Sequence, residues 1–96
     1  MAIQSFQLDP NAGGGLEIKT GNITTDGSGV ATVVFNTALS DTNYAIALGA
    51  IGGTDTVIPM WNNKTVNGFG IGTEDDKGIT EPNANVDWLV TPYVNT

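Results

Sequence analysis

The stretch that decides the fold is residues 62–71, Asn-Asn-Lys-Thr-Val-Asn-Gly-Phe-Gly-Ile. It contains Asn67-Gly68, a strong signal for a hairpin turn because both residue types tolerate a positive φ angle. Phe69 and Ile71 follow with a period of two, which is typical of a strand with one buried face. An apolar-leaning run, residues 56–61, precedes the stretch. The stretch therefore predicts a strand, a polar turn and a second strand.

Similar strand signals lie on either side of it. Residues 86–90 alternate so that Val86, Trp88 and Val90 share one face. Residues 16–20 also alternate, and residues 22–29 after them are rich in turn formers, which predicts a strand followed by a turn. Residues 30–35 are apolar on both faces, which predicts a central strand. Pro59 lies inside the run 56–61 and predicts an edge strand or a bulge there, because proline cannot donate to a central ladder.

No stretch combines a helical period with helix caps, and the polar residues are mostly Thr, Asn, Gly and Ser. We count six or seven short strands, including residues 44–51 and, as an edge strand or arm, residues 3–8. This pattern predicts an all-β fold, either a sandwich or a barrel. The expected core contains apolar side chains from several of these strands, namely Phe35, Ile46, Leu48, Phe69 and Trp88.

The chain has 96 residues, which is enough for one domain but not for two cores. Pro10 and the glycines that follow it interrupt regular structure. We therefore divide the chain into an N-terminal arm with a glycine-rich hinge, residues 1–15, and a β domain, residues 16–96. Ile3, Phe6 and Leu8 are the candidate residues by which the arm docks on a partner. A frayed terminus is the alternative interpretation of the arm.

The charge balance excludes several partners. Ten Asp and Glu stand against three Lys, with no Arg, for a net charge of −7. Such a chain repels the nucleic-acid backbone and lacks the residue that best recognises phosphates. Anionic membrane surfaces are disfavoured for the same reason. The N-terminus has no signal-peptide pattern, and no run is of membrane-spanning length, so we expect synthesis in the cytoplasm and no membrane partner.

Cys and His are both absent, which excludes disulfides, zinc bound by nitrogen and sulfur, and catalytic triads built on His. We expect no cofactor and no metal. The acidic segment 73–78 offers oxygen ligands of the kind that calcium prefers, but a solvated loop is the preferred interpretation. A chain this short leaves little room for a deep cleft, so we predict that the protein is not an enzyme.

Aromatic side chains are the best candidates for ligand contact. Trp61 stands at the end of a predicted strand beside Asn62 and Asn63, and an indole flanked by amides suits a sugar ring. These three residues form the predicted ligand-binding site. Trp88 could also stack on a sugar, but its phase with Val86 favours core packing.

The order of hydrophobic anchors resembles a known domain. A glycine-led strand ends in Phe at residues 29–35, and an aromatic and aliphatic strand follows at residues 43–48. An Asn-Lys-Thr turn then leads to Gly68-Phe69, and the last strand carries a Trp within residues 86–90. This layout resembles the small β-sandwich of bacteriophage tail-fibre tips and H-type lectins, over residues 27–90. The resemblance implies a six-stranded antiparallel sandwich that is homotrimeric and serves on a virion surface or in glycan binding. None of the lectins' sugar-binding residues can be placed in this sequence.

Two functions follow as hypotheses. The first is a virion surface protein of the decoration or accessory type, which docks on other virion subunits as a homotrimer. The second is a lectin-like fibre tip that recognises a host glycan. The short N-terminal segment, which cannot form a fibre shaft, favours the first. Ala45, Ala47 and Gly49 form a face small enough for a second copy to approach. Three copies together carry −21 (3 × −7), so we expect the acidic segment 73–78 to point away from the trimer axis.

Overall fold

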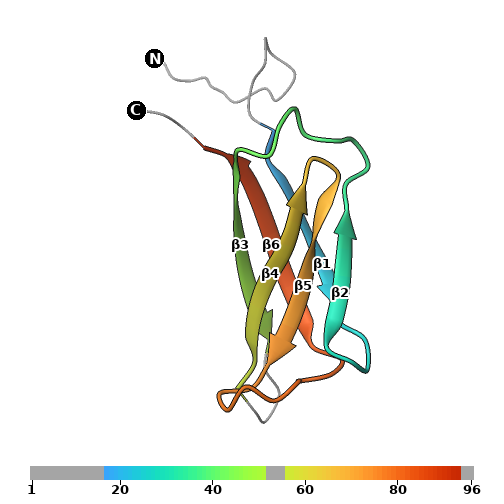
Figure 1. Ribbon diagram of the computed structural model, residues 1–96, viewed down its shortest axis with the longest axis vertical. Coiled ribbons are helices and arrows are strands. Elements are labelled where there is room, and N and C mark those ends of the chain that lie inside the picture. Colours follow the sequence, from blue (N-terminus) through green and yellow to red (C-terminus); the bar gives the residue numbers. More distant parts are fainter. Residues whose placement is uncertain (1–16, 52–55, 94–96) are drawn as a thin grey trace.

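The structure, a computed structural model, describes residues 17–51 and 56–93. It confirms the all-β fold, with two antiparallel sheets of three strands and no helix in the described part of the chain. Figure 1 shows the two sheets as two layers, with the order β1-β6-β3 in one and β2-β5-β4 in the other. The strands are β1 (Lys19–Thr24), β2 (Val30–Val34), β3 (Tyr44–Ile51), β4 (Ile58–Thr65), β5 (Gly68–Glu74) and β6 (Asn85–Pro92).

The core lies between the layers, on side chains that alternate inward from each strand. The fully enclosed members are Val33, Phe35, Leu39, Tyr44, Phe69, Ile71, Val86 and Val90. Phe35 and Phe69 are buried as predicted, while Ile46, Leu48 and Trp88 are partly buried and pack against the cluster. The Phe35 ring lies 6.1 Å from that of Phe69 and 5.9 Å from that of Trp88, between centroids. The contact between Phe35 and Trp88 joins the two sheets.

The predicted hairpin forms, but its turn is shorter than expected. The strand β4 runs on to Thr65, with an irregularity in its pairing between Asn62 and Thr65, and only Val66 and Asn67 form the turn. Gly68 is the first residue of β5, with a φ angle of 149°, and a Cβ there would collide with the Val33 carbonyl oxygen. The glycine of the Asn-Gly pair is thus required by close approach to β2.

Two strand predictions were wrong in detail. The segment 22–24 was expected to belong to a turn, but β1 extends to Thr24 because all six of its residues pair with β6. Residues 30–35 were expected to form a central strand, but β2 lies at a sheet edge, since β5 takes the centre. The strand β4 is the other edge, which confirms the prediction drawn from Pro59.

Two loops share one construction. Asp26 Oδ1 accepts hydrogen bonds from the backbone N–H groups of Ser28 and Val30, at 2.8 and 3.1 Å. Asp75 Oδ1 does the same for Lys77 and Ile79, at 2.8 and 2.9 Å. In each loop the glycine three residues after the Asp has a positive φ angle, 71° in the first and 79° in the second. The sequence pattern Asp-X-X-Gly therefore builds both turns.

The predicted arm lies outside the described residues. This holds for Ile3, Phe6 and Leu8 and for the boundary between residues 15 and 16. Their predicted role in docking stays a prediction.

Candidate functional site

The outer surface of β2-β5-β4 is apolar, and we call it the glycine face. Strand pairing places Val30, Gly72 and Met60 side by side, and Thr32, Gly70 and Asn62 in the next row. The face consists of the outward residues Val30, Thr32, Val34, Ile58, Met60, Asn62, Gly68, Gly70 and Gly72. Val34 is 72% exposed, Val30 50% and Met60 42%. Large aliphatic side chains so exposed on one contiguous face are typical of an interaction surface.

The centre of this face is low and its margins are raised. Gly70 and Gly72 on β5 carry no side chain, while the aliphatic side chains stand on β2 and β4 to either side. A Cβ at Gly70 would overlap Oδ1 of Asn62, so the Asn62 amide lies over that glycine. At Gly72 the nearest atom to an added Cβ would be 4.0 Å away. The surface over Gly72 is therefore open, and by the groove we mean this strip without side chains between Val30 and Met60.

The outer surface of β1-β6-β3 carries a cluster of amide side chains beside the exposed aliphatic residues Leu89 and Ile51, and we call it the amide face. The Asn22 side chain donates hydrogen bonds to Oδ1 of Asn85 at 2.9 Å and to Oδ1 of Asp87 at 2.7 Å. Asn85 donates back to Oδ1 of Asn22 at 3.0 Å. Ala45, Ala47 and Gly49, the small residues predicted to meet a second copy, lie on this same face, because β3 pairs with β6.

The predicted ligand site at Trp61, Asn62 and Asn63 divides between two sides of β4. Trp61 pairs with Ile71 and so lies toward the inner side of the sheet edge, where its ring is 45% exposed. Asn62 pairs with Gly70 and faces outward. Asn63 has a φ angle of 52°, and its amide donates to Oδ1 of Asn62 at 3.2 Å. The three side chains do not converge on one surface, and their role in ligand binding stays a prediction.

Lys64 occupies the edge where β3 and β4 approach each other, a position that no sequence pattern indicated. Its Nζ donates to the carbonyl oxygen of Tyr44 at 2.9 Å and to the hydroxyl of Tyr93 at 3.3 Å. It also lies 5.0, 5.5 and 5.2 Å from the ring centroids of Tyr44, Trp61 and Tyr93. Cation–π contacts of this kind stabilise by about 0.5–2 kcal/mol. The ammonium therefore links the two sheets at this edge.

Tyr44 is enclosed beneath this ammonium. Its hydroxyl donates to the carbonyl oxygen of Thr65 at 2.7 Å, which ties β3 to the end of β4. Burial raises the pKa of the Tyr44 hydroxyl above its ordinary value of 10.0. The side chain is thus neutral at physiological pH and serves as a polar anchor within an apolar core.

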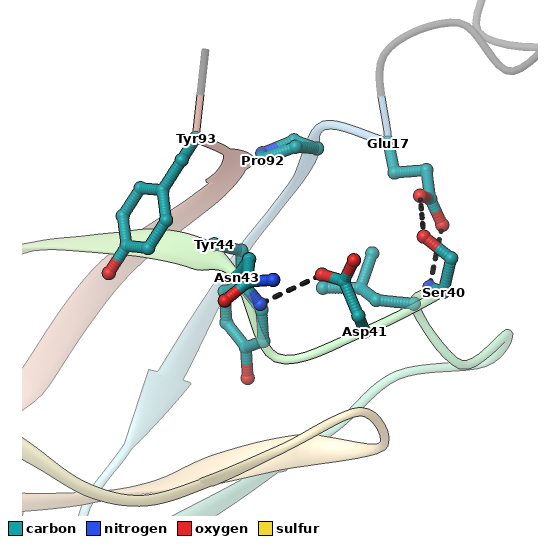
Figure 2. Close-up of a pocket in the computed structure, with 8 residues that line it drawn as sticks. Glu17, Ser40, Asp41, Asn43, Tyr44, Pro92 and Tyr93 are labelled. Carbon is teal, nitrogen blue, oxygen red and sulfur yellow. Dashed lines mark hydrogen bonds between the residues drawn. The ribbon is translucent and has the colours of Figure 1, made fainter. Parts of the chain in front are cut away.

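A pocket of about 500 Å³ opens at the end of the sandwich where β3 begins and β6 ends. We call it the end pocket, and Figure 2 shows the residues around it. Its lining combines carboxylates, amide and hydroxyl groups with aromatic and apolar side chains, namely Glu17, Leu39, Ser40, Asp41, Asn43, Tyr44, Pro92 and Tyr93. No sequence pattern indicated a site at residues 39–43. Asn43-Tyr44 and Pro92-Tyr93 come together only through strand pairing across the sheet.

The acidic segment 73–78 is the possible calcium site for which a solvated loop is the preferred interpretation. Asp75 uses its carboxylate to hold its own loop, and the backbone hydrogen bonds from Ile79 and Lys77 lower the pKa of this carboxyl below its ordinary value of 3.8. Among residues 17–51 and 56–93 there is no group of three or more acidic side chains that could hold a metal ion. The loop geometry is thus explained by turn formation.

Comparisons with known proteins name no relative. No protein-family model, no curated protein and no solved structure matches the chain.

In the part of the chain that the structure describes, no helix has the length and hydropathy of a membrane span.

Proposed function

We propose that the chain is a non-enzymatic structural protein of a bacteriophage virion surface, of the decoration or accessory type, which docks on other virion subunits as a homotrimer. The virion setting and the number three come from the resemblance of its hydrophobic anchors to fibre-tip domains. The observation that carries an assembly role is the glycine face. It is a broad apolar surface on a chain that otherwise carries a high negative charge.

Charge favours the glycine face as the contact between copies. No charged residue lies among its outward positions from Val30 to Val34, from Met60 to Asn62 or from Gly68 to Gly72. Glu74 stands at its far end, opposite Ile58. Each copy carries a net charge of −7, so contact between copies costs the least electrostatic free energy where their surfaces are uncharged. Unpaired charges in an interface are expensive to desolvate. Burial of the exposed aliphatic side chains adds about 25 cal/mol per Å² before the costs of association.

The amide face suits this role less well. Asp87 lies on its central strand, so copies packed through it would bring carboxylates together. Its amides already satisfy one another through Asn22 and Asn85. The Ala45, Ala47 and Gly49 positions remain the alternative contact that the sequence predicted.

Light scattering coupled to size exclusion tests the assembly. We expect the mass of three chains at micromolar concentration, with little change on raising salt, because an uncharged apolar contact is not screened. A single-chain mass at every concentration and salt would contradict the homotrimer. Imaging of the native particle would then test the virion role by itself, since a monomer could still assemble on its partner.

The second candidate is a fibre-tip domain that recognises a host glycan. The observation that favours it is the end pocket, which the exposed Tyr93 lines together with Asp41 and Asn43. The two candidates predict different positions, on a capsid or at the tip of a tail fibre. Labelling of the chain within intact particles separates them.

A further inference from the structure

The end pocket has a rim that is held by hydrogen bonds within the described chain. Glu17 accepts from the backbone N–H of Ser40 at 3.1 Å and from its hydroxyl at 2.8 Å. Asp41 Oδ1 accepts from the backbone N–H of Asn43 at 2.8 Å, and the N–H of Tyr93 donates to the carbonyl oxygen of Asn43 at 3.0 Å. Figure 2 shows the Glu17–Ser40 and Asp41–Asn43 bonds. A rim tied in this way loses little entropy when a ligand binds.

The loop beneath the rim is also anchored to the opposite sheet. The N–H of Leu39 donates to the carbonyl oxygen of Val66 in the hairpin turn at 2.8 Å, and the Leu39 side chain is buried. Tyr44 lies below, with its hydroxyl bonded to Thr65. The floor of the pocket therefore belongs to the core and keeps its shape.

The groups that face the opening combine an aromatic ring with hydrogen-bonding side chains. Tyr93 is 61% exposed and presents its ring at one side of the pocket, with Pro92 beside it. The second carboxylate oxygen of Asp41 and the side-chain amide of Asn43 make no hydrogen bond to another described residue. An amide both donates and accepts, and a carboxylate accepts, which suits the hydroxyl groups of a sugar.

The charge of the pocket restricts the ligand class. Two carboxylates, Glu17 and Asp41, line it, and both disfavour an anionic ligand. The nearby cation, Lys64, is engaged with the Tyr44 carbonyl oxygen and the aromatic rings. The volume of about 500 Å³ falls within the range of small-molecule sites.

We propose that the end pocket is a binding site for a neutral saccharide, with the Tyr93 ring as the stacking platform and Asp41 and Asn43 as hydrogen-bonding partners of the sugar hydroxyls. This inference deepens the glycan-recognition candidate and is independent of the assembly role. It also replaces Trp61 by Tyr93 as the aromatic platform.

The test is a nuclear magnetic resonance titration of the full chain with methyl glycosides of glucose, galactose, mannose and N-acetylglucosamine. N-acetylneuraminic acid serves as the anionic probe. We expect at least one neutral glycoside to shift the backbone amides of Ser40, Asp41, Asn43 and Tyr93. Tyr93→Ala and Asn43→Ala should each weaken that binding by about tenfold, whereas Tyr93→Phe, which keeps the ring, should leave it nearly unchanged.

Trp61→Ala distinguishes the two aromatic platforms, because Trp61 is a second exposed aromatic residue next to the same lysine. Ile79→Ala is the control, because Ile79 is as exposed as Tyr93 but follows the end of β5 that lies away from the end pocket. Both should leave the titration unchanged, and thermal melting should show that every variant is folded. The proposal is overturned if none of the neutral glycosides shifts the pocket residues. It is also overturned if Trp61→Ala abolishes binding while Tyr93→Ala does not, or if the anionic sugar binds as tightly as the neutral ones. Light scattering on the same samples reports assembly separately, so one proposal can fail without the other.

Discussion

The outward surfaces of the two sheets differ in chemistry although one core supports both. On the amide face, Asn22, Asn85 and Asp87 bond to one another and hold polar groups at the centre of the sheet. On the glycine face, the central strand presents Gly70 and Gly72 between the exposed side chains of Val30 and Met60. The amide cluster, whose hydrogen bonds are satisfied within the sheet, has little to gain from a partner. An exposed apolar groove gains the free energy of removing its side chains from water.

The difference between the two faces arises from the central strands, β5 and β6. On both β5 and β6 alternate residues face inward, with Phe69 and Ile71 buried on β5 and Val86 and Val90 buried on β6. The outward positions of β6 are Asn85, Asp87, Leu89 and Thr91, whereas those of β5 are glycines up to Glu74. The inward residues thus specify the sandwich, and the outward residues specify what each face can contact.

The largest expected effect concerns the core that both faces share. Trp88 and Leu89 are neighbours on β6, one facing the Phe35 and Phe69 rings and the other facing solvent. Trp88→Ala should reduce the free energy of unfolding by about 3–5 kcal/mol, while Leu89→Ala should change it by less than about 1 kcal/mol. Chemical denaturation measures both values. Equal effects of the two changes would mean that Trp88 is not part of the core.

The next effect compares the faces directly. Val34→Asp places a charge on the glycine face, and Ala47→Asp places the same charge on the amide face. An unpaired charge in a desolvated contact costs about 2–5 kcal/mol, so Val34→Asp should weaken self-association by roughly thirtyfold or more. Ala47→Asp should leave the assembled mass unchanged. The reverse result in light scattering would assign the contact to Ala45, Ala47 and Gly49 instead.

A smaller effect separates a change in association through the groove from a change in the stability of the fold. An added Cβ at Gly72 would meet its nearest atom at 4.0 Å, and one at Gly49 would meet nothing within 4 Å. Gly72→Ala and Gly49→Ala should therefore both preserve the melting temperature of the monomer. Only Gly72→Ala fills the groove between copies, so it alone should weaken association, by about tenfold, as an overpacked contact does. Sedimentation at a series of concentrations measures this difference, and equal association constants for the two variants would exclude the groove.

The smallest effect lies at the loop beyond the far end of the glycine face. The pKa of the Asp75 carboxyl is lower in the folded chain than in the unfolded chain, so the folded chain binds a proton at this carboxyl more weakly. The ionised carboxylate therefore stabilises the folded chain above the ordinary pKa of 3.8, and this stabilisation is lost as the pH falls through the lower pKa of the folded chain. Asp75→Asn should therefore reduce the fall of the melting temperature between neutral pH and about pH 2. An unchanged acid profile in this variant would show that Asp75 does not contribute to the pH dependence.

Much of the fold was predictable because local patterns carried it. The period-two spacing of Phe69 and Ile71 and the glycine required at residue 68 specify a hairpin, and Pro59 marks an edge. The predictions failed where pairing partners decide the outcome. Residues 30–35 looked like a central strand because their outward side chains are apolar, and the sequence cannot distinguish a valine covered by another strand from one left exposed.

The candidate sites were less predictable. Trp61, Asn62 and Asn63 are adjacent in sequence, but the strand geometry separates them onto two sides of β4. Tyr93 and Asn43 are far apart in sequence and meet at the rim of the end pocket through a backbone hydrogen bond. No local pattern announces a contact of this kind, because it depends on which strands pair and in which register.

By itself the sequence determined an acidic chain without Cys or His, six or seven short strands and an alternation that buries Phe69, Ile71, Val86 and Val90. These properties follow from residue chemistry and from the two-residue period of a strand, which are local. Only the tertiary structure decided that the valines of β2 flank a row of glycines and that Lys64 lies among three aromatic rings. It also brought Tyr93 beside Asn43. The physical reason is that strand order and register are set by the whole core, which joins residues that the chain keeps apart.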